Sequence, residues 1–234
     1  VVKITDRYPH RPPTYDTPAA IMYTSGTTGP PKGCIVTHGN FLGTASSYIH
    51  VYPFNESDAL LSFLPLAHVY EEVLHYVAVH SRTPIAFYSG SIPRLIDEIK
   101  ILQPTLFISV ARVFERIYEG MQKKISQQSF LTRLAFNTCF SIKSFLLNHF
   151  RMQRVPIIDS VFQKINEQAV GGHMKMFICG GSALSVEIQH FLRIALNVYF
   201  LQGYGLTETA AGVTVQSCTD TLDGNVGVLL HCVQ

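Results

Sequence analysis

Short apolar runs alternate with longer helical segments along most of this 234-residue chain, and this alternation constrains the fold more than any other feature. We expect buried strands over residues 59–64, 84–88, 105–110, 174–179 and 198–201. Strands separated by helices pair in parallel, because the chain needs a long crossover to return to the same end of a sheet. The sequence therefore predicts an α/β fold with parallel-sheet layers and flanking helices.

Residues that favour helix starts separate these runs, namely Thr37 or Asn40, His68, Ser91 and Ser185. Residues 113–170 are predicted to be mostly helical. Residues 1–18 are polar and rich in proline, so we expect an extended lead-in there and a single, partial domain over residues 19–234.

The most distinctive stretch, residues 23–33, is typical of a phosphate-binding loop. It combines hydroxyls, glycines and one cation, which are Thr24, Ser25, Thr27, Thr28, Gly26, Gly29, Gly33 and Lys32. Glycines let backbone N–H groups face a polyanion, and a lysine about 4 Å from a phosphate interacts with it by roughly 4 kcal/mol. The spacing differs from that of the common Gly-x-x-x-x-Gly-Lys-Ser/Thr loop. A polar surface loop is the alternative, which the density of these residues disfavours.

Two more loops are expected beyond the carboxyl ends of strands, where ligands bind in such sheets. The first contains Gly181, Ser182 and Ala183, and the second contains Gln202, Gly203, Tyr204, Gly205, Thr207 and Glu208. Tyr204 can stack on adenine, Thr207 can donate to a phosphate, and Glu208 can bind magnesium. For the second loop alone, a turn with a solvated Glu208 is the alternative. With the phosphate loop at the same edge, we expect one nucleotide site.

His68 follows a predicted strand and heads a predicted helix. It can hydrogen-bond a carboxylate or the acyl phosphate formed from that carboxylate. A histidine beside apolar residues is as often simply packed, so the residues alone leave both interpretations open.

Residues 23–33 resemble the signature of the adenylate-forming enzymes, which include acyl-CoA synthetases, luciferases and the adenylation domains of peptide synthetases. Residues 64–68, 110–118 and 203–209 are similar to the long-chain fatty acyl-CoA synthetase branch of that superfamily. The resemblance covers residues 19–234 and implies part of the large N-terminal domain of such an enzyme. It also implies a ribose-binding aspartate, a hinge and a C-terminal lysine-bearing domain, which we do not find in this sequence.

The resemblance also implies roles for the candidate residues. Adenine would lie against the loop that contains Gly181, and Tyr204 would stack on it. Thr24 and Glu208 would bind magnesium. The expected catalytic residues are Lys32, Thr207, Glu208 and His68, the last at the carboxylate pocket. The sequence departs from the branch at Ala111, at Ser182 and over residues 228–231, where proline, alanine and a proline-rich turn are usual.

Composition restricts the partners and the compartment. A net charge of +2 with 15% charged residues argues against a nucleic-acid binder. The five scattered cysteines predict neither a disulfide framework nor a zinc site, and they favour a reducing compartment, either the cytoplasm or the cytoplasmic face of an organelle membrane. Residues 120–158 carry six Lys/Arg and no Asp/Glu, which predicts either a solvated helical face or peripheral contact with an anionic membrane.

We therefore expect that the intact parent protein uses ATP and magnesium to convert a long-chain fatty acid into acyl-adenylate, and then CoA to form acyl-CoA. The 234 residues alone are expected to bind nucleotide weakly and to be inactive. Two alternatives stay open: a non-catalytic module that binds a nucleotide or an acyl group, and a ligase for another carboxylic acid.

Overall fold

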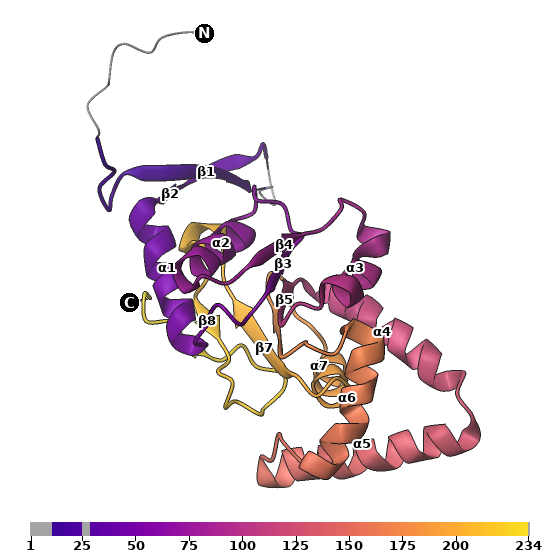
Figure 1. Ribbon diagram of the computed structural model, residues 1–234. Coiled ribbons are helices and arrows are strands. Elements are labelled where there is room, and N and C mark those ends of the chain that lie inside the picture. Colours follow the sequence, from indigo (N-terminus) through magenta and orange to yellow (C-terminus); the bar gives the residue numbers. More distant parts are fainter. Residues whose placement is uncertain (1–10, 25–28, 234) are drawn as a thin grey trace.

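The computed structural model describes residues 11–24 and 29–233, which form two sheets (Figure 1). The larger sheet has seven strands in the order β4-β3-β5-β6-β7-β8-β9. Its members are β3 (Leu60–Ser62), β4 (Ile85–Phe87), β5 (Leu106–Ser109), β6 (Met176–Cys179), β7 (Tyr199–Tyr204), β8 (Thr214–Val215) and β9 (Val228–Leu229). Neighbouring strands in the order β4-β3-β5-β6-β7 pair in parallel, whereas β8 pairs antiparallel with both β7 and β9. The predicted α/β fold with a mostly parallel sheet is confirmed.

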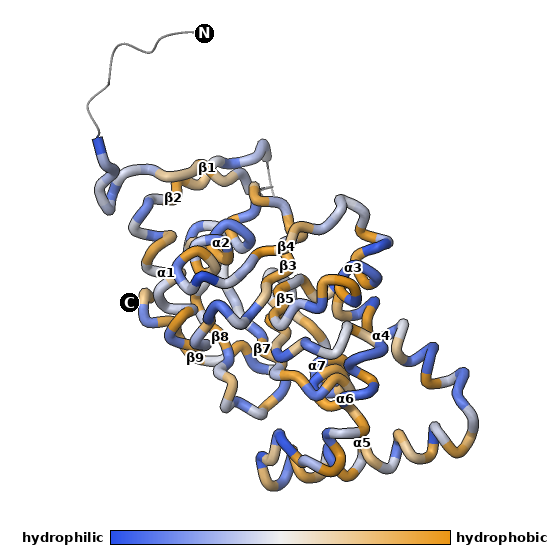
Figure 2. Tube along the Cα trace, in the orientation of Figure 1, coloured by the Kyte–Doolittle hydropathy of each residue, from blue (hydrophilic) through white to orange (hydrophobic). Residues whose placement is uncertain are grey.

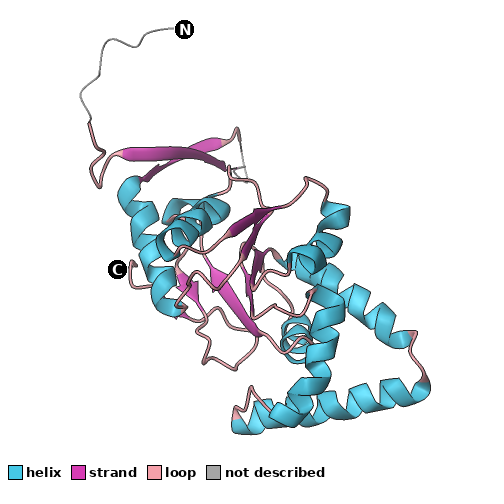
Figure 3. Ribbon diagram, viewed as in Figure 1, coloured by secondary structure: helices cyan, strands magenta, loops and turns pink. Residues whose placement is uncertain are grey.

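Helices cover both faces of this sheet, as Figure 3 shows. One face packs against α1 (His38–Val51) and α2 (Val69–Ser81). The other packs against α3 (Leu95–Leu102), α4 (Ala111–Ser126), α6 (Pro156–Val170) and α7 (Val186–Ala195). Successive strand residues point to opposite faces, so Ile108 and Ile178 enter the first layer while Phe107 and Phe177 enter the second. Figure 2 shows the apolar residues concentrated along these strands and the helix faces that touch them.

Local capping explains several helix starts. Thr37 is the N-cap of α1, and its side chain accepts from the backbone N–H of Asn40 at 3.2 Å. The Asn40 Oδ1 in turn accepts from the backbone N–H of Thr37 at 3.0 Å. The two predicted candidates therefore act together as a capping box. Ser185 caps α7 as predicted. Near Ser91 the chain first forms the short 3-10 helix η1 (Ile92–Arg94) and then α3.

The helix α5 (Phe130–Phe150) forms an outer arm beside α4 and α6 (Figure 1). Lys143 of α5 is buried, and its Nζ lies 2.6 Å from Oδ1 of Asp159 in α6 and 2.6 Å from Oδ1 of Asn197. Nearby, the Arg154 guanidinium donates to the Asn197 carbonyl at 3.0 Å. Two of the six cations in residues 120–158 therefore hold the fold together, and the predicted solvated basic face is only partial.

Two features differ from the sequence prediction. The strands β1 (Pro18–Thr24) and β2 (Lys32–Thr37) form a separate antiparallel sheet, so the phosphate loop does not follow a strand of the main sheet as we expected. The connection between β1, which ends at Thr24, and β2, which begins at Lys32, is too short for parallel pairing. A parallel crossover needs a dozen or more residues. Residues Gly203 and Tyr204, predicted as loop, extend β7 because they pair with β8.

No helix within the described ranges is both long enough and apolar enough to cross a lipid bilayer.

Candidate functional site

A cavity of about 360 Å³, here called the strand-end cavity, lies beyond the carboxyl ends of β6 and β7. Its walls come from the turn at Gly180–Gly181, from the turn at Gly203–Gly205, from the N-terminus of α2, from α1 and from the end of β1. The side chains that line it include Thr24, Tyr48, His68, Tyr70, Tyr204, Thr207 and Glu208. The sheet thus brings residues far apart in the sequence to one edge, which is where open α/β sheets bind ligands.

Two glycines in these walls lie close to neighbouring groups. A Cβ on Gly205 would overlap the carbonyl oxygen of Ala211, because the backbone folds back on itself after β7. A Cβ on Gly180 would lie 3.1 Å from the Tyr70 ring, tighter than most Cβ contacts. The two turns therefore approach their neighbours through backbone atoms, and this leaves room for a ligand above them.

His68 is the N-cap of α2, and its Nδ1 accepts from the backbone N–H of Tyr70 at 3.2 Å. A neutral imidazole that accepts at Nδ1 carries its proton on Nε2. Because His68 lines the strand-end cavity, this Nε2–H is a donor for an oxygen atom there. The helix cap thus fixes the tautomer.

Glu208 belongs to η2 (Thr207–Thr209), a short 3-10 helix that follows β7, and its side chain is exposed. The 3-10 helix η2 contacts β2, and burial, and then the Glu208 charge, raises the pKa of Cys34 in β2. Thr24 at the end of β1 lines the same cavity. No cluster of three or more His, Cys, Asp or Glu forms within the described part of the chain. One carboxylate beside a hydroxyl, without competing ligands, fits magnesium that takes its other ligands from phosphate and water.

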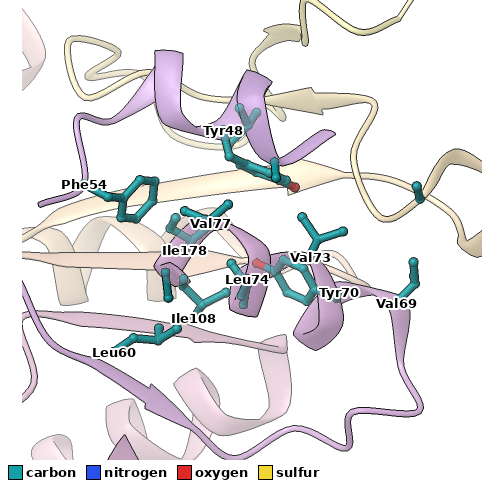
Figure 4. Packing of buried hydrophobic residues seen from close by; sticks show 14 of the residues in the cluster. Tyr48, Phe54, Leu60, Val69, Tyr70, Val73, Leu74, Val77, Ile108 and Ile178 are labelled. Atoms are coloured by element: carbon teal, nitrogen blue, oxygen red, sulfur yellow. The ribbon is translucent and has the colours of Figure 1, made fainter. Parts of the chain in front are cut away.

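Tyr48 and Tyr70 are site residues that the sequence analysis did not identify. Both line the cavity and are buried among aliphatic side chains, as Figure 4 shows. Neither hydroxyl has a hydrogen-bond partner among the residues that the structure describes. Burial raises the pKa of Tyr48 and of Tyr70, so both hydroxyls stay protonated and can donate. Tyr70 could have been noticed two residues after His68, whereas Tyr48 looks like any core residue of a helix.

The remaining predicted residues lie in three different settings. Lys32 and Gly29 are exposed on the β1–β2 hairpin, and Ser182 and Ala183 are exposed beyond Gly181; none of them lines the cavity as described. Gln202 is buried, and its Nε2 donates to Gln189 at 2.6 Å while its Oε1 accepts from the Leu184 backbone at 3.3 Å. Its side chain thus serves a buried amide network. Ser25, Gly26, Thr27 and Thr28 lie outside the described residues.

A second polar chain of contacts has the order of a catalytic triad. Ser144 Oγ lies 2.8 Å from His190 Nε2, and His190 Nδ1 lies 2.7 Å from Asp223 Oδ2. Ser144 sits within α5, where the helix uses the surrounding backbone N–H groups, so they cannot stabilise an oxyanion. We interpret this chain as an anchor that joins α5 to α7.

Comparison with known proteins identifies relatives of this chain. Fatty acyl-CoA synthetase B of Dictyostelium discoideum is 39% identical over 226 residues, which cover 94% of this chain and 33% of that protein. Peroxisomal long chain acyl-CoA synthetase 7 of Arabidopsis thaliana is 34% identical over 94% of this chain and 31% of its own length. The chain thus spans about a third of the length of these relatives.

Solved structures share the fold. ATP-bound MatB from Rhodopseudomonas palustris superposes with a TM-score of 0.63 at 22% identity, covering 93% of this chain and 35% of that one. Bacillus subtilis o-succinylbenzoate CoA synthetase in complex with its acyl-adenylate intermediate gives 0.64 at 21% identity, covering 94% and 36%. The sequence model of the AMP-binding enzyme family matches residues 2–234. The chain therefore belongs to the family of AMP-binding enzymes.

Proposed function

We propose that the protein activates a long-chain fatty acid in two steps. In the first step a carboxylate oxygen of the fatty acid attacks the α-phosphorus of ATP, and pyrophosphate leaves. In the second step the CoA thiol, losing its proton, attacks the acyl carbon, and AMP leaves. The observation that carries the proposal is the strand-end cavity, which gathers a base-stacking aromatic, an imidazole donor and a carboxylate at one sheet edge.

Each residue has a proposed role in the first step. Tyr204, exposed beside the Gly180–Gly181 turn, stacks on adenine, and Thr207 contacts the α-phosphate. The Nε2–H of His68 holds the fatty carboxylate toward the phosphorus. Lys32 is proposed to neutralise the departing phosphates. Thr24 and Glu208 would hold magnesium, which when bound neutralises developing phosphate charge.

The names of the relatives support a long-chain acid as the substrate. The test is acid-dependent pyrophosphate release by the full-length protein with octanoate, palmitate and benzoate. We expect the highest kcat/KM with palmitate. A preference for benzoate would favour the ligase for another acid, and ATP binding without pyrophosphate release would favour the binding module.

Lys32 tests the phosphate part of the proposal. We expect Lys32→Ala to raise the KM for ATP and to slow pyrophosphate release, because its charge faces the leaving group. Lys100→Ala, which removes a half-exposed lysine of α3 that lies outside the strand-end cavity, should change neither value. Equal behaviour of the two variants would contradict the role of Lys32.

We further propose peripheral membrane contact through residues 120–158. Six large apolar side chains are exposed on α5, and we consider four of them here, Leu131, Leu134, Ile142 and Phe145. Their spacing of three, eight and three residues puts them on one face of a helix. Lys123 and Arg151 are exposed beyond its two ends, where they can meet anionic headgroups. Co-sedimentation with vesicles that contain phosphatidylserine should be lost in Leu134→Glu and kept in Asn137→Glu.

A further inference from the structure

A second hollow, here called the helical groove, lies among α4, α5 and α6. Its volume is about 350 Å³, within the range of small-molecule sites. The groove shares no lining residue with the strand-end cavity. Its apolar lining comes from all three helices and includes Met121, Ile125, Phe136, Val161 and Ile165.

One cation from each helix completes the lining, namely Lys124 of α4, Arg133 of α5 and Lys164 of α6. All three side chains are exposed, and none forms an ion pair with another residue that the structure describes. No Asp or Glu lines the groove. An apolar bed with three unpaired cations is complementary to a molecule that has one apolar chain and one anionic head.

We propose that the helical groove binds a long-chain fatty carboxylate at a site separate from the proposed reaction. The alkyl chain lies along Ile125, Phe136 and Ile165, where it removes apolar surface from water. The carboxylate lies among the three cations. Inorganic anions would leave the apolar bed exposed, and an uncharged lipid would leave the cations without a partner. The inference does not rest on the proposed activity, because the two hollows have no residue in common.

The experiment uses palmitate that carries a photoreactive diazirine on its chain, added to the purified protein without ATP or CoA. Cross-linked peptides are identified by mass spectrometry. We expect labelled peptides that contain Met121 or Ile165, in addition to any from the strand-end cavity. Excess palmitate should compete with the probe for the groove. Hexadecanol should compete poorly because it has no carboxylate, and octanoate should compete poorly because its alkyl chain is short.

Two variants test the charges and the apolar bed separately. Replacing Lys124, Arg133 and Lys164 by Gln should weaken groove labelling roughly tenfold, since each exposed pair contributes modestly. Ala135→Trp should block the groove from an exposed position, and Asn137→Trp, on the same helix but outside the lining, is its matched control. Circular dichroism checks that each variant is folded.

Labelling of the cavity without labelling of the groove would overturn the inference and leave the proposed function intact. Groove labelling that is insensitive to the triple variant, or that hexadecanol competes away as well as palmitate does, would also overturn it. A change of oligomeric state in Ala135→Trp without any groove labelling would assign the groove to a second copy of the chain. If the full-length protein releases no pyrophosphate with any of the three acids but its groove is labelled, only the proposed function is contradicted.

Discussion

The strand-end cavity and the helical groove have similar volumes but are built by different means. In the cavity, backbone turns lie close to neighbouring groups at Gly180 and Gly205, and the Tyr48 and Tyr70 hydroxyls have no hydrogen-bond partner among the described residues. In the groove, side chains of three helices form the walls, and the buried Lys143–Asp159 pair joins two of those helices. Backbone turns at the sheet edge therefore place polar groups around the cavity, whereas packed helices give the groove a mainly apolar wall.

The largest expected effect is on the helical side. Asp159→Leu leaves the Lys143 charge buried with the Asn197 amide and the Phe162 ring beside it but no anion, and should lower the free energy of unfolding by about 3–5 kcal/mol. The double variant Lys143→Met/Asp159→Leu should recover most of that loss, because no charge is then buried. Urea unfolding measures both values. If the double variant is as unstable as the single one, packing rather than charge joins α5 to α6.

In the strand-end cavity the largest effect should be on rate and not on stability. Glu208→Gln keeps the side-chain shape but removes the charge, and we expect adenylation to slow by roughly 10²- to 10³-fold. Because Glu208 is exposed, the unfolding temperature should hardly change. Pyrophosphate release at limiting magnesium is the measurement. An unchanged rate there would refute the metal role of Glu208.

Backbone approach in the cavity wall is tested by Gly205→Ala. The added Cβ overlaps the Ala211 carbonyl, so we expect a loss of about 1–3 kcal/mol in unfolding free energy. Gly120→Ala is the matched control, since nothing lies within 4 Å of a Cβ there and α4 should gain about 0.5–1 kcal/mol. Thermal denaturation compares the two. Equal stability would show that the turn relaxes easily.

Alkaline pH tests the burial of Cys179, which directly precedes the Gly180–Gly181 turn. Burial, and then the charge of Glu115, raises the pKa of Cys179 from 9.0 to about 12. The unfolded thiol loses its proton at lower pH than the folded one, so its contribution to stability is present below pH 9.0 and is lost toward about pH 12. The slope for one such group is about 1.4 kcal/mol per pH unit. Chemical unfolding across this window should show a shallower decline in Cys179→Ala.

The smallest expected effect concerns Tyr70. Tyr70→Phe removes a hydroxyl that has no partner among the described residues, so stability should change by less than about 1 kcal/mol. A ligand that accepts a hydrogen bond there would nevertheless bind less tightly. The KM for the fatty acid and the unfolding temperature are measured together. A large stability loss with an unchanged KM would make Tyr70 a core residue only.

Much of this arrangement could be predicted from local sequence. The strand periodicity around Phe107 and Phe177 identified two core strands, and Thr37 and Ser185 marked helix starts through their own hydrogen bonds. The two-residue strands β8 and β9 are too short to leave a periodic pattern. The Lys143–Asp159 contact joins two different helices and therefore leaves no local pattern.

The candidate site was also predictable only where its residues belong to one local sequence motif. Tyr204 and Glu208 belong to one continuous loop motif, and both line the cavity. Tyr48 reaches the cavity from α1 only because α1 packs beside β7 at the sheet edge. The residues around Tyr48 in the sequence do not predict this packing.

The most direct test of the central claim is a crystal structure of the protein with a non-hydrolysable palmitoyl-adenylate analogue. We predict that adenine lies between Tyr204 and the Gly180–Gly181 turn, with the phosphate mimic near Thr207 and the acyl carbonyl near His68. An adenosine group bound in the helical groove, or anywhere away from the carboxyl ends of β6 and β7, would contradict the account.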